Sequence, residues 1–598
     1  MSAADTKGYR EVTFGAVSLG VIQGAVMTAA FVYIGMKLGF GLPGSTVAAI
    51  LGFALLRGVG RNVFKVAGAG SIVENNINQT IASGINTASA GVVFTFPALY
   101  LLGLGDEINF PIIIVSAIAG SFMGIVVIIP LRKQMIEIER LKFPSGVAVA
   151  TILKSPGAGM DKAVLLGAGF VVSLGITLAT KFELLPETLE IGAWIRDLID
   201  GPDTGAGGVV LAGTALSLSM ANFGAGLLSG KGGLAFAVGG VLAWWVIAPF
   251  VAGQGWVPPD AAGEDLKWAV YGANLRPVGI GVLIGGALMG VVMSYPALKG
   301  AISSLRAAAK LAKTGEASND ELPPSVLGFG LVGAFLALFA VAIVGSEGAW
   351  AMALSVAVAG TVWLGLAGLI VAQATGATDI SPLSGLALIA VTLMLALTAN
   401  NIMLAVTIGV AVCVATNQCA DMMSDLKTGH LVGSVPRRQQ LVQFMVAWIG
   451  PAIAVGTVWL LWQSGPNGAD GFGPDSQACI DKTVDCLPAP QAGALQGMVE
   501  GVVSGQAPLD KYLAGGAIGL ALALFPIGGL GVLIGLAMYL PFEITFGYGI
   551  GCVASMLLEK WRGRRFYADV LVPVAAGFIV GEALTSLSLT LIKLATGS

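Results

Sequence analysis

The sequence predicts an all-α polytopic membrane protein, and composition and hydropathy carry that prediction. Of 598 residues, 56% are hydrophobic and only 11% are charged, whereas soluble domains carry about 25% charged residues. Apolar runs long enough to cross a bilayer recur along the chain, among them residues 12–34, 111–129, 164–180, 278–293 and 441–462. Gly, at 86 residues, is frequent enough to let membrane helices approach one another closely.

One polar run interrupts this pattern. Residues 74–80 carry six polar side chains in seven, namely Glu74, Asn75, Asn76, Asn78, Gln79 and Thr80 around Ile77. Unpaired polar groups are costly in lipid and usually face the protein interior or a water-filled path. The run therefore predicts one wall of a transport pathway. Two plainer interpretations stay open: the amides could bond a neighbouring helix, and Glu74 could pair with a base such as Lys65.

Charge asymmetry predicts the orientation. By the positive-inside rule, basic clusters face the cytoplasm and the acidic loops face outward, so the N-terminus is cytoplasmic. The basic clusters are residues 7–10, 57–65, 132–142, 299–313, 427–438 and 560–565; the acidic ones are 106–107, 183–203, 260–265 and 470–485. Cys479 and Cys486 lie in the long hydrophilic loop 464–511, which this assignment places outside. We therefore expect a disulfide between them.

The same assignment requires an even number of crossings between residues 65 and 132. Three apolar stretches compete there, at about 66–83, 85–104 and 110–131. The last two flank an acidic loop, so the segment at 66–83, which holds the polar run, is expected to be broken or re-entrant. The short segment 142–155, with Pro144-Ser145-Gly146, also does not fit an even number of crossings, so we expect it to be interrupted too. Interrupted helices of this kind mark the binding sites of secondary transporters.

The second part of the chain holds counterparts in a similar order. An amide and carboxylate patch lies at residues 415–425, with Asp421 and Asp425 four residues apart and thus on one helical face. A further broken segment is expected at 540–551, where a Leu-Pro step precedes a glycine-rich stretch. These features predict two related halves, residues 1–320 and 321–598. Asp425, close to Lys427, could equally belong to a solvated cytoplasmic helix end.

Five segments spread along the chain form a recognisable series. They are residues 74–80 (ENNINQT), 130–133 (PLRK), 143–150 (FPSGVAVA), 420–430 (ADMMSDLKTGH) and 577–582 (GFIVGE). In this order they resemble motifs of the oligopeptide transporter (OPT) superfamily, yellow-stripe-like branch. The resemblance covers nearly the whole chain, and the string Asp-x-x-x-Asp-x-Lys-Thr-Gly from Asp421 is its most specific part.

The resemblance implies about 16 membrane segments. It also implies proton-coupled uptake of peptides, or of metals chelated by peptide-like ligands, and we expect a prokaryotic member in the bacterial inner membrane. The chain departs from the family pattern at Phe143, where the family has Tyr, and at residues 417–421 and 580–583. These departures fall near the expected substrate contacts, so the substrate stays open between peptide, glutathione-like molecule and metal chelate.

Other classes of protein find little support. Residues 224–232 resemble a phosphate-binding P-loop but lack its first Gly and its Ser or Thr, which excludes an ATPase of that type. The chain has one histidine, His430, so neither a histidine metal site nor a serine–histidine dyad is expected. No basic, aromatic-rich stripe predicts nucleic-acid binding. We expect no enzyme, no metal site and no cofactor, with the proton as coupling ion.

The prediction from sequence is a proton-coupled secondary transporter that works by alternating access; a channel or a non-transporting receptor or scaffold is the alternative. Its partners are a small peptide or chelate and membrane lipid, and the oligomeric state, including a homo-oligomer, stays open. Candidate substrate-binding residues are Asn75, Asn76, Asn78, Gln79, Ser145, Asn417, Gln418 and Tyr548. Candidate proton-coupling residues are Glu74, Asp421 and Glu582, although Glu582 could be a structural tie between helices.

Overall fold

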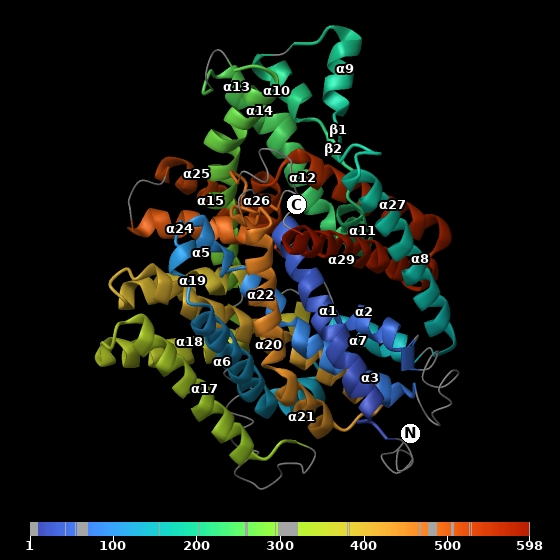
Figure 1. The fold of residues 1–598 in the computed structure, drawn as a ribbon, viewed down its shortest axis with the longest axis vertical. Helices are drawn as coiled ribbons and strands as arrows, with labels where there is room; N and C mark the ends of the chain where they lie inside the picture. The colour runs from blue at the N-terminus through green and yellow to red at the C-terminus, as the bar shows by residue number, and fades with distance from the viewer. Residues whose placement is uncertain are drawn as a thin grey trace. The chain divides into compact units, whose positions relative to one another are not determined.

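The chain folds into two compact helical units in the computed structural model (Figure 1). Unit 1 comprises Met1–Gly35, Phe40–Ala163 and Val291–Trp462; unit 2 comprises Met36–Gly39, Val164–Gly290 and Gln463–Ser598. Each unit thus combines segments from both of the halves expected from sequence. The structure describes residues 10–41, 44–53, 55–56, 70–154, 156–202, 204–257, 261–293, 295–296, 299, 321–378, 381, 383–465, 468–476, 487–503, 508–525, 527 and 529–596.

Unit 1 is built from helices of two sequence regions. The first region supplies α1 (Phe14–Leu38), α2 (Gly44–Gly52), α3 (Ile72–Asn86), α4 (Ala88–Val93), α5 (Pro97–Leu101), η2 (Gly105–Glu107), α6 (Phe110–Ile128), η3 (Ile129–Leu131), the π-helix η4 (Lys133–Ile138) and α7 (Pro144–Leu153). The second supplies α17 (Pro324–Gly345), α18 (Trp350–Thr378), α19 (Leu383–Leu397), α20 (Ile402–Val432), α21 (Pro436–Val446) and α22 (Ile449–Gln463).

Unit 2 is also helical, with one two-stranded antiparallel sheet. Its first region holds α8 (Pro156–Lys181, from Val164 onward), α9 (Ile191–Ile199), α10 (Gly205–Gly213), α11 (Met220–Ser229), η5 (Gly230–Gly233), α12 (Leu234–Leu242), η6 (Ala243–Ile247), α13 (Ala248–Gly253), α14 (Gly263–Val270), η7 (Tyr271–Leu275) and α15 (Arg276–Met293). Strands β1 (Thr188–Leu189) and β2 (Leu216–Ser217) pair Thr188 with Ser217. Its second region holds α24 (Pro490–Val503), α25 (Leu509–Ala523), α26 (Leu530–Tyr539), α27 (Phe542–Arg562), α28 (Arg564–Phe566), η9 (Tyr567–Leu571) and α29 (Val572–Thr596).

The helices confirm an all-α polytopic membrane protein. Within the described residues, 11 helices are long and apolar enough to cross a membrane, or 12 if the bent pair α21 and α22 forms one span. Three shorter apolar helices, α7, α19 and α26, accompany them. A helix of 10 residues, such as α7, is about 15 Å long, which is half of a bilayer core. The family resemblance implied about 16 membrane segments, and the described residues hold 11 or 12 candidate spans by length and composition.

The polar run does not break its helix. Residues 74–80 lie inside α3, and Ile72–Leu101 forms a single candidate span of 30 residues. The three stretches expected between residues 66 and 131 are therefore two spans, Ile72–Leu101 and Phe110–Leu131. Two spans are an even number of crossings, so the basic clusters on either side can face the same compartment without a re-entrant segment. The expected break at residues 66–83 was therefore wrong for the described part, which begins at Gly70.

Other interruptions expected from sequence have mixed outcomes. Residues 415–425 are continuous helix within α20, so this patch is not broken. The Leu540-Pro541 step does separate α26 from α27, because Leu540 is extended, but the glycines that follow lie inside α27. The hydrophilic loop expected at 464–511 contains helix α24. The short helix α7 agrees with an interrupted segment near 142–155.

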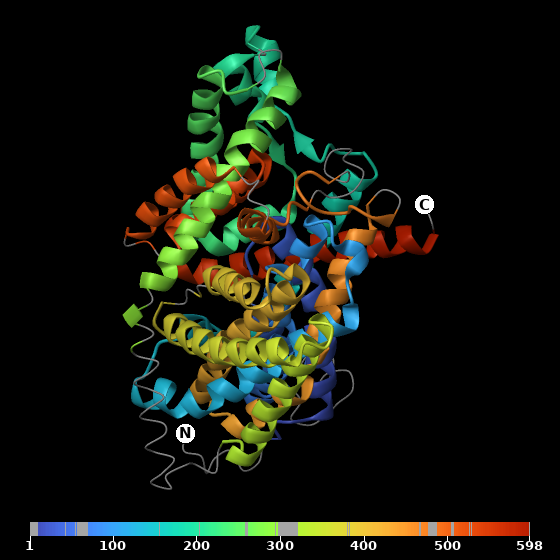
Figure 2. The same ribbon diagram turned by 90° about the vertical axis from the view of Figure 1, so that its left-hand side faces the viewer.

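Helix α20 lies at the centre of unit 1. Its neighbours include α6, α18, α19, α7, α4 and α3, and Figures 1 and 2 show α18 and α19 beside it. Close approach to α6 depends on glycine, since a Cβ on Gly120 would lie 2.3 Å from the carbonyl oxygen of Ala411. A buried apolar cluster fills the space between these helices, including Ile125, Phe143 and Met422.

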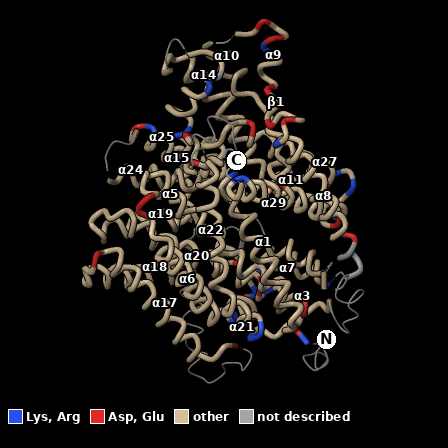
Figure 3. The backbone as a smooth tube through the Cα atoms, in the orientation of Figure 1, with Lys and Arg blue, Asp and Glu red and all other residues tan. Residues whose placement is uncertain are grey.

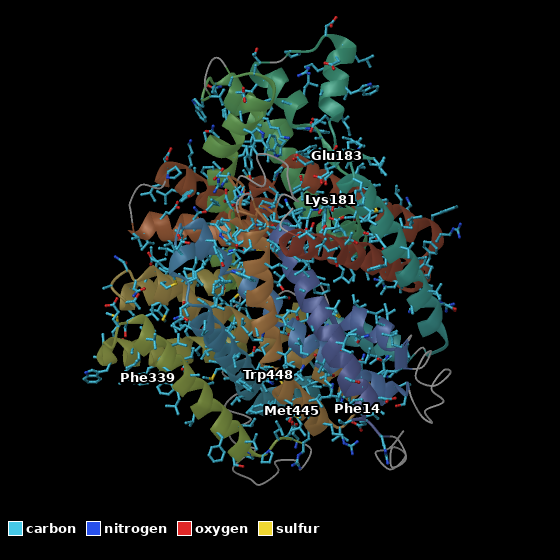
Figure 4. The ribbon with its side chains drawn as sticks, viewed as in Figure 1. Phe14, Lys181, Glu183, Phe339, Met445 and Trp448 are labelled. Carbon is cyan, nitrogen blue, oxygen red and sulfur yellow. The ribbon has the colours of Figure 1, made fainter. Side chains whose placement is uncertain are left out.

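The surfaces of both units are rich in apolar side chains. Helices α17 and α18 carry no charged residue and are tan along their lengths in Figure 3. Phe14, Met445 and Trp448, labelled in Figure 4, are exposed in unit 1. Exposed apolar side chains on spanning helices are the surface that lipid would cover.

Candidate functional site

The first turn of α3 explains part of the polar run. Ser71 is the N-cap of α3, and its hydroxyl accepts a hydrogen bond from the backbone N–H of Glu74 at 3.2 Å. The Glu74 carboxylate reaches back to accept from the backbone N–H of Gly70 at 2.7 Å and from the hydroxyl of Thr13 at 2.5 Å. Ser-x-x-Glu is the sequence of a capping box, a signal that sequence reasoning missed here. Glu74 thus starts the helix and ties it to the segment before α1; its proton-coupling role stays a prediction.

Asn75 and Asn78 join α3 to two neighbouring helices. The Asn75 side-chain amide donates to the carbonyl oxygen of Ala49 in α2 at 2.9 Å. The amide of Asn78 donates to the side-chain oxygen of Gln23 in α1 at 3.0 Å. A Cβ on Gly52 would lie 1.8 Å from the Asn75 oxygen, so glycine in α2 makes room for this amide. These contacts are interhelical hydrogen bonds of the ordinary kind in membrane proteins.

Asn76 and Gln79 face the other side of α3, toward the end of α20 and the start of α21. Asn76 donates to the hydroxyl of Ser434 at 3.0 Å. Gln79 donates to the side-chain oxygens of Asn76 and Thr80, each at 3.1 Å. Thr80 also accepts from Gln439 of α21 at 2.9 Å.

These side chains form a buried amide cluster, which we define as Gln23, Asn75, Asn76, Asn78, Gln79, Gln439 and Gln443. Several of its atoms have no hydrogen-bond partner among the described residues: Gln23 Nε2, Asn78 Oδ1, Gln79 Oε1, Gln439 Oε1 and Gln443 Oε1. Buried amide groups are nearly always paired with protein, water or ligand. The cluster therefore has spare hydrogen-bonding capacity, mostly of acceptor oxygens, inside spanning helices.

The predicted patch on α20 lies against α3 and α4. Asn417, half-buried, donates to the backbone oxygen of Thr87 at 2.9 Å and to the carboxylate of Asp421 at 3.4 Å. Asp421, also half-buried, accepts from the hydroxyl of Thr87 at 2.9 Å. Gln418 is 1% exposed, and neither atom of its amide has a partner among the described residues. Its neighbour across the helix interface is Gly124 of α6.

Asp425, which the sequence places on one helical face with Asp421, is enclosed in the structure. It is 1% exposed, which does not fit the alternative interpretation of a solvated cytoplasmic helix end. One carboxylate oxygen accepts from the hydroxyl of Ser45 in α2 at 3.1 Å, and the other accepts from the amide of Gln443 in α21 at 2.9 Å. The backbone oxygen of Asp425 accepts from Gln439 at 2.9 Å. Three long-range partners could not be read from the spacing along α20.

Ser145 lies half-buried in the first turn of α7, which packs on α20. The next residue, Gly146, meets α20 directly: a Cβ there would lie 2.4 Å from the backbone oxygen of Ser424. The hydroxyl of Thr428 donates to the backbone oxygen of Gly146 at 2.9 Å. Ser145 in α7 therefore lies near the C-terminal half of α20, the helix that also carries Asn417 and Asp421.

The remaining predicted residues lie in unit 2. The Glu582 carboxylate on α29 accepts from the ammonium of Lys37 and the hydroxyl of Ser219, both at 2.7 Å, and from the backbone N–H of Ala221 at 2.9 Å. Ser219 is the N-cap of α11, so Glu582 also faces that helix N-terminus, where negative charge is favoured. A buried, paired carboxylate of this kind fits the interhelical tie that was the alternative.

Tyr548 is buried inside α27, with its ring 4.9 Å from that of Phe236 in an edge-to-face arrangement. Its hydroxyl occupies the space where a Cβ on Gly233 would lie, at 2.4 Å. The structure does not group Tyr548 or Glu582 with the residues of unit 1, since contacts place them in unit 2. The predicted substrate contact of Tyr548 stays a prediction.

Two acidic residues outside the spans of unit 1 are paired with arginine. Burial raises the pKa of Glu11, while the guanidinium of Arg438 at 3.0 Å opposes that change. Burial likewise raises the pKa of Glu321, and Arg132, which hydrogen-bonds it, acts in the opposite direction. Buried carboxylates in this unit can therefore be stabilised by a base where one is within reach.

The structure offers no metal centre within its described part: no group of three or more His, Cys, Asp or Glu side chains is placed to hold an ion. Cys479 and Cys486, expected to form a disulfide, lie outside the described residues. Cys413, Cys419 and Cys552 are free and buried.

The fold and this buried polar region define a polytopic membrane protein with polar side chains inside its spanning helices. A family profile described as "OPT oligopeptide transporter protein" matches residues 11–593. The chain therefore belongs to the OPT family, and its yellow-stripe-like resemblance is confirmed by two plant relatives. The "Metal-nicotianamine transporter YSL2" of Arabidopsis thaliana is 25% identical over 98% of this chain and 94% of its own length.

Two further relatives are named as transporters of other substrates. The "Putative oligopeptide transporter" of Haemophilus influenzae is 26% identical over 94% of this chain and 92% of its own length. The "Iron-phytosiderophore transporter yellow stripe 1" of Zea mays is 24% identical over 79% of this chain and 72% of its own length. The names of these relatives describe transporters of oligopeptides, of metal–nicotianamine and of iron–phytosiderophore.

Proposed function

We propose that this chain is a proton-coupled secondary transporter that imports oligopeptides or peptide-like metal chelates by alternating access. The observation that supports this most is the polar set on α3, α20 and α21, buried within helices able to span a membrane. Such side chains are expensive in lipid and mark substrate or ion pathways. The relatives, named as transporters of oligopeptides, metal–nicotianamine and iron–phytosiderophore, support this substrate class.

Substrate recognition by neutral hydrogen bonds suits such a molecule, because peptides and amino-acid chelators carry amides, ammonium and carboxylate groups together. Gln418 is the best-placed contact, since its buried amide has no partner among the described residues. Half-buried Asn417 lies one residue before it. The other proposed contacts are Asn75, Asn76, Asn78, Gln79, Ser145 and Tyr548.

Proton coupling requires a carboxyl that gains and loses a proton during the cycle. The residues proposed from sequence are Glu74, Asp421 and Glu582; in the structure Glu74 caps α3, Glu582 pairs with Lys37, and Asp421 is half-buried. We propose a location in the bacterial inner membrane from the family resemblance, and a cytoplasmic N-terminus from the distribution of basic residues.

The test is uptake into proteoliposomes that contain the purified full-length chain. A radiolabelled tetrapeptide and nickel–nicotianamine serve as probes, with and without an imposed gradient of about one pH unit. Such a gradient supports about tenfold accumulation if one proton moves per neutral substrate, because one pH unit and a tenfold ratio are equivalent free energies. Saturable, gradient-driven accumulation of either probe is the expected result.

The same experiment separates the alternatives. A channel would let the probe equilibrate without accumulation, and unlabelled probe on the far side would not accelerate labelled uptake. A receptor or scaffold would bind the probe, seen as a raised melting temperature, but show no flux. Either outcome would refute the proposed function.

A further inference from the structure

Among the buried acids of the described residues, Asp425 alone has neither a cation nor a helix N-terminus beside its carboxylate. Its two carboxylate oxygens accept from two neutral donors, the Ser45 hydroxyl and the Gln443 amide. It forms no ion pair with any described residue. It also lies in the C-terminal half of α20, where the backbone N–H groups are already used by the helix. An ionised carboxylate in this place would be buried without a balancing charge.

The other buried acids show the contrast. Glu582 has Lys37 and the N-terminus of α11, Glu11 has Arg438, and Glu74 lies in the first turn of α3. Each has a cation or free helix N–H groups, which favour the ionised form. For Asp425 the protonated form has the lower free energy. In that form one carboxyl oxygen donates a hydrogen bond while the other still accepts one.

Charged groups near Asp425 do not supply the missing partner. The described helices that pack on α20 beside it are α2, α3, α7 and α21. Among these, α2 and α7 carry no charged residue, α3 carries only Glu74, and α21 carries Arg437 and Arg438, both exposed. On α20 itself the charged neighbours are Asp421, one turn earlier, and Lys427, with His430 further on; Lys427 forms no ion pair with Asp425.

Asp421 supplies a path for exchange. It lies four residues before Asp425 on the same helix, a spacing that places the two Cβ atoms about 6 Å apart, and it is half-buried while Asp425 is enclosed. Its carboxylate is held by the Thr87 hydroxyl and the Asn417 amide, both of which are neutral donors. Two carboxyls at this spacing disfavour double ionisation, so they share a proton readily.

We propose that Asp425 carries the coupling proton in this conformation and exchanges it through Asp421. In the step, the O–H bond of the Asp425 carboxyl breaks and one forms on the Asp421 carboxylate, which leaves Asp425 ionised and Asp421 neutral; Asp421 then gives the proton to water. No other reactant is needed. This inference rests on the proposed function, because a coupling proton has meaning only in a proton-driven transporter, but protonation of Asp425 can be measured without transport.

The first measurement is infrared spectroscopy of the reconstituted wild-type protein between about pH 6 and 9. An ordinary aspartate side chain is ionised throughout this pH range. A protonated buried carboxyl gives a C=O band that shifts in D₂O. We expect this band in wild type and in Asp106→Asn, which removes an exposed acid in η2 with the same chemistry. We expect it to be lost in Asp425→Asn. A band that persists in Asp425→Asn overturns the proposal, whether or not any probe is transported.

The second measurement is transport of the tetrapeptide or nickel–nicotianamine. Asp425→Asn should lose gradient-driven accumulation, with an inside-to-outside ratio near 1, about tenfold below wild type under a gradient of one pH unit. It should retain exchange of labelled for unlabelled probe, which needs no net proton movement. Accumulation at the wild-type ratio in Asp425→Asn refutes the proposal while leaving the proposed function intact. No transport by wild type refutes the proposed function instead.

A second variant covers the case in which Asp425→Asn does not fold. Gln443→Leu removes one donor to the carboxylate, which favours the ionised form through that hydrogen bond. Its loss should strengthen proton binding, so the midpoint of the pH dependence of uptake should move to higher pH. A midpoint that is unchanged or moves to lower pH contradicts the role of Asp425.

Discussion

At the scale of single residues, the pair of Lys37 and Glu582 predicts a measurable coupling. Their charged groups lie 2.7 Å apart and both side chains are nearly fully buried. Removing one member of a buried pair costs about 3–5 kcal/mol, whereas replacing both with apolar residues is often close to neutral. Lys37→Met should therefore lower stability strongly, and the double variant with Glu582→Leu should recover most of the loss. Thermal unfolding in detergent, followed by intrinsic fluorescence, measures both.

The recovery should be incomplete. Glu582 also accepts from the backbone N–H of Ala221, which would be left unpaired at a cost of about 1–3 kcal/mol. If Lys37→Met alone were as stable as wild type, the buried pair would not contribute as the geometry indicates.

Sequence identified individual residues only in part. It located the amides of α3 and Asn417, Gln418 and Asp421, because polar side chains in apolar runs stand out. For Asp425 it left open a solvated cytoplasmic helix end, because Lys427 follows two residues later, whereas the structure buries this carboxyl. The partners that enclose Asp425, Ser45 and Gln443, are 380 and 18 residues away in the chain. Burial created by such distant contacts is not encoded in local spacing.

At the scale of elements, glycine decides how closely α11 and α27 pack. A Cβ on Gly226 of α11 would lie 2.0 Å from the backbone oxygen of Tyr548, and one on Gly551 of α27 would lie 2.2 Å from that of Phe223. Backbone cannot move aside as a flexible side chain can. Gly226→Ala should therefore lower the free energy of unfolding by about 1–3 kcal/mol, as overpacking does.

Gly175, inside α8, is the matched control for this substitution. A Cβ there would meet no atom within 4 Å, so Gly175→Ala should leave stability unchanged or raise it by up to about 1 kcal/mol through helix propensity. Both variants are compared by thermal unfolding in the same detergent. Equal melting temperatures for the two variants would contradict close packing of α11 on α27.

Helix boundaries were harder to predict than helix content. The capping signal at Ser71 and Glu74 and the Leu540-Pro541 step are local, and both mark real boundaries. The break expected at residues 66–83 came from counting apolar stretches, and Ile72–Leu101 joins two of them. Glycines 547, 549 and 551 do not interrupt α27, because in a membrane helix glycine often serves packing rather than termination.

At the scale of the whole molecule, exposed tryptophans should report the lipid contact of unit 1 and unit 2. Trp459, in α22, is 44% exposed, whereas Trp244, in η6, is 1% exposed. Brominated lipid quenches only tryptophans that it can touch. We expect Trp459→Phe to reduce the quenched fraction of the protein's fluorescence in bromolipid vesicles, and Trp244→Phe to leave the quenched signal intact. Quenching lost in Trp244→Phe instead would contradict the burial pattern.

Composition was sufficient for the class of the whole molecule, because hydrophobic residues at 56% and charged residues at 11% leave few alternatives to a membrane protein. Its spatial organisation was not predictable in the same way. Both units combine early and late segments of the chain, and contacts between α3 and α20, over 300 residues apart, leave no periodic signal.

The junction between α21 and α22 has a consequence for the working cycle. The two helices meet at an angle of 41° after Val446, and α21 carries both Gln439 and Gln443. These amides bind the backbone oxygen and the carboxyl of the same residue, Asp425. A small swing of α21 about this bend would withdraw both amides at once, so a single movement of α21 would open the enclosed carboxyl of Asp425 to water.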